Sequence, residues 1–157
     1  MANLTDICAV LKNYFLKDYI NYSDIKRGTF TISGHTIAPL DVKEGQYFRI
    51  KGSDLNDGVW QNTAADLANL RNETFDGEVW LMSVPRDFEQ LAVDINAWRL
   101  KYENADSANM SPFTSENVQG VYSYNKGSSG SSGGSNSTDW QTQFKSRLSA
   151  YRRISEL

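Results

Sequence analysis

Residues 126 to 138 are almost wholly glycine, serine and asparagine, and they contain no large apolar side chain. Such a stretch has too little apolar surface to offset the entropy that is lost when a chain is ordered. We therefore expect a flexible loop that separates a C-terminal helix from the rest of the fold. The whole chain has 157 residues, which suffices for one modest core but not for two ordinary domains. The sequence thus predicts a single domain over residues 1–157.

Three segments carry apolar residues at helical spacing. The first runs from about residue 3 to 20, with Asn3 available as its N-cap. The second follows Pro85, which fits a first helical turn because its missing N–H has no intrahelical partner there. The third can be capped by Thr138 or Asp139, and basic residues toward its end complement the helix dipole. We predict three amphipathic helices.

Between the first two helices the apolar period changes from three or four residues to two. Phe30 and Ile32 alternate with polar residues, and further short apolar stretches follow at 47–50 and 59–60. Asp57-Gly58 supplies a residue that tolerates positive φ where the chain must reverse. The predicted fold class is α+β: a small helical bundle of three main helices with a β-hairpin-rich insertion at about 25–60.

Residues suited to catalysis are few. His35 and Cys8 are the single histidine and the single cysteine, so a nucleophile–base pair would have to use His35. His35 follows Gly34 in a predicted turn, and Cys8 lies on the apolar stripe of the first helix, where it acts as a small apolar residue. We predict no catalytic residue, no cofactor and no metal site.

Two further patterns resemble ligand sites in part. Asp54, Asn56, Asp57 and Gly58 resemble the start of a calcium loop but lack the later ligands, so a hairpin turn is the better interpretation. The glycines between 127 and 134 are not followed by Lys-Ser/Thr, as a phosphate-binding loop would require.

Charge and apolar content limit the partners. The formal net charge of −3 provides no basic field for tight phosphate binding. No uninterrupted apolar run approaches the roughly 20 residues that span a bilayer, and the first residues lack a signal-peptide pattern. A lone cysteine cannot form an intramolecular disulfide. We expect a protein of a reducing compartment.

The C-terminal third carries a recognisable motif. The segment 115–124 reads SENVQGVYSY, and after the Gly/Ser stretch the last helix closes on LSAYRRI at 148–154. This order resembles the head-tail connector (head-completion adaptor) family of long-tailed bacteriophages, in which Ser-Glu-x-Val/Ile-Gly-x-Tyr-Ser precedes a helix ending Leu-x-x-Tyr-Arg-Arg. Gln119 adds a residue before the glycine, and Val121 stands where that family commonly has an acidic residue.

The resemblance implies a virion protein that forms a ring at the head-tail junction after assembly in the host cytoplasm. A ring of about twelve subunits would match the portal protein, dock on it and present a platform to a tail-side stopper or tail-completion protein. Acidic charge around such a ring would let DNA pass without specific binding. Aromatic and arginine side chains are the expected anchors of the portal or subunit interface. These candidates are Tyr122, Tyr124, Trp140, Tyr151, Arg152 and Arg153.

Two alternatives stay open from the sequence. One is another small virion or tail-completion protein, and the other is an unrelated β-containing binding module or enzyme.

Overall fold

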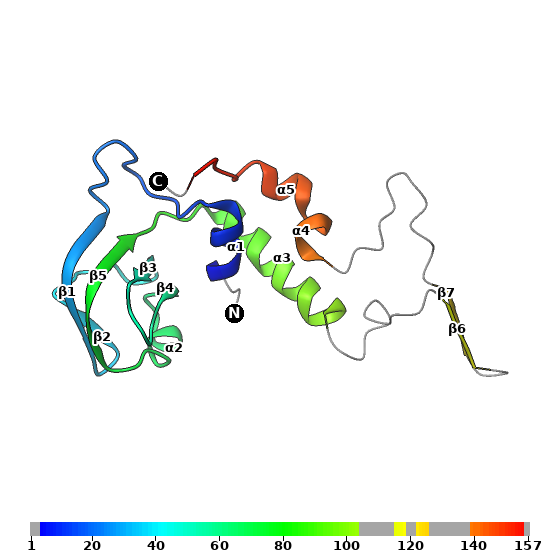
Figure 1. Ribbon diagram of the computed structural model, residues 1–157, viewed down its shortest axis with the longest axis horizontal. Coiled ribbons are helices and arrows are strands. Elements are labelled where there is room, and N and C mark those ends of the chain that lie inside the picture. Colours follow the sequence, from blue (N-terminus) through cyan, green and yellow to red (C-terminus); the bar gives the residue numbers. More distant parts are fainter. Residues whose placement is uncertain (1–3, 104–114, 119–121, 126–138, 156–157) are drawn as a thin grey trace. The chain divides into compact units, whose positions relative to one another are not determined.

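The computed structural model describes residues 4–103, 115–118, 122–125 and 139–155 (Figure 1). The chain divides into two compact units. The sheet unit is drawn from residues 3–90 and 151–157, and the helical unit from residues 91–150.

The sheet unit is built on five antiparallel strands in the order β2-β1-β5-β3-β4 (Figure 1). The long strands β1 and β5 pair over most of their length at the centre of the sheet, which curls into a half-barrel. The strands are β1 (Ile25–Ser33), β2 (Thr36–Ala38), β3 (Tyr47–Lys51), β4 (Gly58–Gln61) and β5 (Glu73–Leu81). A short helix, α2 (Ala64–Leu67), follows β4.

This architecture corrects the predicted fold class. The main part of the described chain is a curled antiparallel sheet with a few helices, and not a three-helix bundle with a hairpin insertion. The error came from the segment 73–81, which lies outside the predicted insertion and forms the central strand β5. Because β5 pairs with both β1 and β3, it joins two separate hairpins into one sheet.

The inner face of the half-barrel forms an apolar core. Alternate residues of three neighbouring strands point to the same face, as the period of two requires. The buried residues of this cluster are Phe30, Ile32, Phe48, Ile50, Leu70, Phe75 and Val79. The residues between them lie on the outer face, which is polar over most of its area.

The first helix is much shorter than predicted. Helix α1 spans Leu4–Leu11, because Lys12 adopts φ 54° and reverses the chain. Hydrogen bonds from Asn13 N to Cys8 O and from Lys12 N to Ala9 O complete a Schellman-type end. Glycine normally occupies the left-handed position of this motif, so the lysine hid the end of the helix from sequence reading. The apolar residues after it, Tyr14, Phe15 and Leu16, are buried without being helical.

Helix α3 (Arg86–Tyr102) confirms the prediction made from Pro85 and the apolar period. The predicted third helix is divided into α4 (Trp140–Gln143) and α5 (Lys145–Ser149). Of the two predicted caps, Thr138 and Asp139, it is Asp139 that caps α4 through its side chain. Arg152 and Arg153 follow the end of α5, so the prediction that they lie at the end of a helix is wrong.

The helical unit contains most of α3, with α4, α5 and a two-stranded hairpin. Arg147 pairs with Asp94 at 2.8 Å, and the ring centroids of Trp98 and Phe144 lie 6.3 Å apart. The hairpin joins β6 (Ser115–Val118) to β7 (Tyr122–Asn125) in antiparallel register. The predicted flexible loop at 126–138 lies outside the described residues. Within the part of the chain that the structure describes, no helix combines the length and apolar character needed to cross a membrane.

Candidate functional site

Strand β1 is paired along most of its length on one side and over a short stretch on the other. Strand β5 pairs with Ile25 through Ile32, whereas β2 pairs with Thr31 through Ser33 alone. Figure 1 shows β2 beside the C-terminal end of β1. The segment from Ile25 to Phe30 therefore has one unpaired side, which we call the open edge.

The direction of each backbone group in β1 follows from the hydrogen bonds around it. Leu81 N donates to Asp24 O, so residue 24 and the even-numbered residues after it face β5. The odd-numbered residues face the other side, and Ile25 N donates there to Tyr22 O. Arg27 and Thr29 therefore direct their N–H and C=O groups outward. Neither N–H donates to another residue within the described parts of the chain.

Side chains near the open edge are held away from it. Arg27 Nε donates to Glu78 Oε1 at 2.7 Å, and the Thr29 hydroxyl donates to Asp76. Both acceptors belong to β5, on the side of β1 opposite the open edge. Lys26 Nζ reaches back to Ser23 O at 2.8 Å. Charged side chains commonly shield exposed strand edges, but here they leave the backbone groups accessible.

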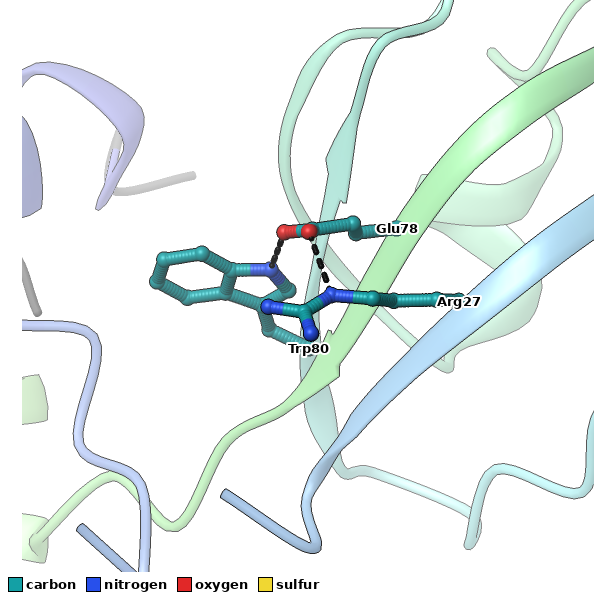
Figure 2. Close-up of polar contacts among 3 residues, drawn as sticks. All are labelled: Arg27, Glu78 and Trp80. Carbon is teal, nitrogen blue, oxygen red and sulfur yellow. Dashed lines mark hydrogen bonds and ion pairs between the residues drawn. The ribbon is translucent and has the colours of Figure 1, made fainter. Parts of the chain in front are cut away.

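Glu78 organises the outer face beside the open edge (Figure 2). Its carboxylate accepts from the buried Trp80 Nε1 at 2.8 Å as well as from Arg27. Partial burial would raise the pKa of Glu78, but these hydrogen bonds and the nearby positive charges outweigh it and lower the pKa. Glu78 is therefore a carboxylate at neutral pH, and it holds the Arg27 guanidinium over β5.

A groove of about 480 Å³ runs along the open edge. Its lining comes from β1, from the segment that follows β2 and from the last residue of β5. Its lining residues are Lys26, Arg27, Gly28, Thr29, Phe30, Pro39, Leu40, Asp41 and Leu81. Backbone donors and acceptors thus lie beside apolar side chains, which is the combination that binds an added β-strand.

The opposite edge of the sheet is closed. In β4 the residues that face outward are Val59 and Gln61, since Asn62 N donates inward to Gln46 O. Val59 N donates to Thr5 Oγ1 at 3.0 Å, and Gln61 N donates to Asp66 Oδ2 at 2.5 Å. Asp66 is only 7% exposed. Both outward N–H groups of β4 therefore have intramolecular acceptors.

Three of the residues predicted for an interface lie in the sheet unit. Tyr151 packs its ring against Phe15 and Phe88, with centroid distances of 6.0 and 5.1 Å. The Arg153 guanidinium stacks on Tyr19 at 3.8 Å from the ring centroid, and its Nε is buried without a hydrogen-bond partner among the described residues. Arg152 is exposed. Of these three residues Arg152 is the exposed one, and Tyr151 and Arg153 are half-buried.

The other three predicted residues belong to the helical unit. Trp140 is 7% exposed and lies 5.8 Å from the Arg99 guanidinium. Tyr122 and Tyr124 are part of β7, in register with Val118 and Glu116 of β6. The motif that carries the family resemblance is thus the β6–β7 hairpin followed by the C-terminal helices.

Cys8 and His35 occupy the places that sequence reading gave them. Cys8 is fully buried, and burial raises the pKa of its thiol to about 12, so it is no thiolate nucleophile near neutral pH. Gly34 and His35 form a two-residue turn between β1 and β2 with φ of 57° and 66°. His35 is exposed there.

The calcium-like segment is the turn between β3 and β4, as predicted. Its carboxylates and amides bond to the protein itself: Asp57 accepts from Gly52 N, and buried Asn56 donates to Arg71 O. Glu73 accepts hydrogen bonds from Ser53 and Asn56, and these bonds lower its pKa. Among the described residues, no cluster of three His, Cys, Asp or Glu side chains could hold a metal ion.

A second cavity, of about 170 Å³, opens on the inner face of the half-barrel near Ile37, Val42 and Leu67. Pockets for drug-sized ligands usually occupy about 300 to 1,000 Å³. This cavity is smaller. His35 and Asp41 both line it, but among the described residues no hydrogen bond or ion pair joins them, so the open edge is the stronger candidate.

Comparisons with protein-family models, with curated proteins and with solved structures find no match to this chain. The candidate site therefore rests on its own geometry. Sequence reading missed it, because apolar residues alternate with polar ones only at Phe30 and Ile32. That short pattern does not mark the longer strand, which begins at Ile25.

Proposed function

We propose that this chain is a structural virion protein whose copies assemble into a ring at the head-tail junction of a long-tailed bacteriophage. In this proposal the ring docks on the portal protein and provides a platform for the next tail-side component. The motif at 115–124 and the ending at 148–154 support the phage assignment, because their order resembles the connector pattern. The proposal does not depend on a helical bundle, since function resides in surfaces and not in fold class.

The contrast between the two sheet edges carries the assembly part of this proposal. A protein that stays monomeric benefits from protecting both edges, because unpaired strands recruit other chains. Here the β4 edge is capped by Thr5 and Asp66, whereas the outward groups of Arg27 and Thr29 remain available beside a groove. One protected edge and one open edge suit directional contact with a partner chain.

Co-purification with a portal protein, followed by negative-stain imaging, tests the proposal. We expect a ring with a central hole that binds the portal. A chain that remains monomeric alone and does not bind portals from long-tailed phages would overturn the proposal. If the chain instead has an enzymatic or small-ligand function, neither a ring nor portal binding is expected.

The two C-terminal arginines provide a matched pair of variants for the same experiment. Arg152→Lys keeps the charge but removes the planar fork that binds carboxylates, and its side chain is free of the core. We expect weaker portal docking with unchanged melting of the free protein. Arg153→Lys removes the stacking on Tyr19 and should lower the melting temperature instead. Equal docking by wild type and Arg152→Lys would exclude Arg152 from the portal contact.

A further inference from the structure

We infer that the open edge of β1 binds the β6–β7 hairpin of a neighbouring copy of this chain. This inference rests on the proposed ring and names the contact that closes it. Each subunit would present the groove along Ile25–Phe30 to one neighbour and its own hairpin to the other. Such a contact uses two different patches, and repetition of a heterologous contact closes into a ring when the rotation per subunit allows it.

The hairpin lacks a sheet of its own. Within the described residues β6 and β7 pair only with each other, whereas the other five strands form a separate sheet. An isolated two-stranded hairpin is marginally stable in water, and a third strand or a packed face is needed to stabilise it. The open edge of β1 provides that third strand, and the hairpin provides the strand that the edge lacks.

The lengths of the two elements agree. Each hairpin strand has four residues, and the open edge runs from Ile25 to Phe30. At about 3.3 Å per residue, a four-residue strand spans about 13 Å. It can therefore lie along β1 between the end of β2 and the start of the sheet and accept hydrogen bonds from Arg27 N and Thr29 N.

The chain also allows the hairpin to reach a neighbour. Residues 104–114 connect α3 to β6, and residues 126–138 connect β7 to α4. Chains of these lengths span at most on the order of 35 to 45 Å. That limit exceeds the radius of a small domain, so the covalent connections permit contact with an adjacent subunit.

Complementary proline variants test this inference. Thr29→Pro removes an outward N–H while leaving the β1–β5 ladder intact, and Thr29→Val is its control because both variants lose the hydroxyl contact with Asp76. Ser123→Pro acts on β7 in either orientation of its N–H. If the N–H faces β6, the hairpin loses a hydrogen bond; if it faces outward, the hairpin loses a donor for the docked edge. Ser123→Ala is the control. Native mass spectrometry of the full-length chain reads the assembly state.

We expect both controls to form rings like the wild type and each proline variant alone to form none. A one-to-one mixture of the proline variants retains a single functional groove and a single functional hairpin per pair. It should therefore give a heterodimer and nothing larger. Absence of the heterodimer, as expected if each hairpin docks on its own subunit, overturns the inference. Rings formed by Thr29→Pro also overturn it.

Hydrogen–deuterium exchange on the wild-type chain gives a second test that does not depend on how the variants fold. The amides of Arg27 and Thr29 should exchange quickly in the dissociated subunit and slowly in the ring. Unchanged exchange at both amides in assembled rings overturns the inference but leaves the proposed function intact. A wild-type chain that forms no ring, alone or with the portal, contradicts the proposed function itself.

Discussion

The two edges of the five-stranded sheet meet solvent in opposite ways. At the β4 edge, two side chains from other elements accept hydrogen bonds from the outward N–H groups of Val59 and Gln61. At the open edge of β1, side chains that could shield the backbone are bonded to β5 or to the preceding turn. The sheet is short at both edges, so length does not explain this difference. The placement of hydrogen-bond acceptors explains the difference between the two edges.

This difference shows how one sheet can favour a directional contact. If both edges were open, the chain could pair in several ways and form open-ended aggregates. Capping β4 removes one of these pairings and leaves the side of the sheet on which β2 and the open edge of β1 lie. The two hydrogen bonds that Thr5 and Asp66 accept favour this selection.

Proline substitutions on β1 should distinguish the N–H groups that face β5 from those that face outward. Lys26 and Arg27 are both exposed, but only the Lys26 N–H faces β5. Lys26→Pro should lower the free energy of unfolding by about 3 kcal/mol, because it removes a ladder hydrogen bond and leaves a carbonyl of β5 unpaired. Arg27→Pro should cost about 1 kcal/mol, mainly through the lost pair with Glu78.

Urea denaturation of the two variants measures this difference. Equal losses would mean that the assignment of inward and outward groups along β1 is incorrect. The contrast between the edges would then lose its structural basis.

Removing a cap from the β4 edge should allow this edge to pair with another chain. Asp66→Ala removes the acceptor of Gln61 N at a buried position, and we expect a loss of about 2 kcal/mol. Asp66→Asn keeps an oxygen at the same place and serves as the control. Thermal melting gives the stability, and sedimentation velocity should show association beyond that of the wild type for Asp66→Ala but not for Asp66→Asn. If Asp66→Ala melts and sediments like the wild type, Asp66 does not protect this edge.

Thr5 provides a smaller version of the same test. Its hydroxyl oxygen accepts from Val59 N, so Thr5→Val should cost about 1 kcal/mol, while Thr5→Ser should be close to wild type. Gly58 lies close to this side chain, and a Cβ there would approach Thr5 Oγ1 at 3.2 Å. If Thr5→Val and Thr5→Ser have the same melting temperature, the hydroxyl does not protect this edge.

Local features of the fold could be predicted from the sequence. Pro85 and the apolar period placed the helix that follows it, and Asp139 marked the start of α4. The turn at Gly34-His35 and the turn between β3 and β4, which ends at Asp57, were also found. Each of these depends on a few adjacent residues, whose conformational preferences are visible without the rest of the chain.

Non-local features could not be predicted in the same way. The strand β5 contains Asp76 and Gly77 in its middle, so its apolar pattern is interrupted where it crosses the sheet. Gly77 is required there by space, since a Cβ would lie 2.3 Å from Lys51 O of β3. Because β5 was not predicted, the two hairpins were interpreted as separate, and the fold class was wrongly predicted as a helical bundle with a hairpin insertion. The open edge was missed for the same reason, because it depends on which strands flank β1.

The smallest expected effect concerns the charge that keeps the open edge clear. The hydrogen bonds to Glu78 lower its pKa in the folded protein below the ordinary value of 4.5. A carboxylate with a lowered pKa stabilises the fold above the unfolded-state pKa and loses that contribution as the pH falls through the folded-state pKa. The stability difference between wild type and Glu78→Gln should therefore be below about 1 kcal/mol at pH 7. It should shrink as the pH falls below about 4.5 and weaken at high salt. Denaturation between pH 7 and pH 3 measures it, and a difference that persists unchanged at pH 3 would show that packing, not charge, is responsible. Loss of this charge also frees Arg27 to lie over the open edge, so Glu78→Gln should assemble less readily than wild type at pH 7 even though its stability hardly changes.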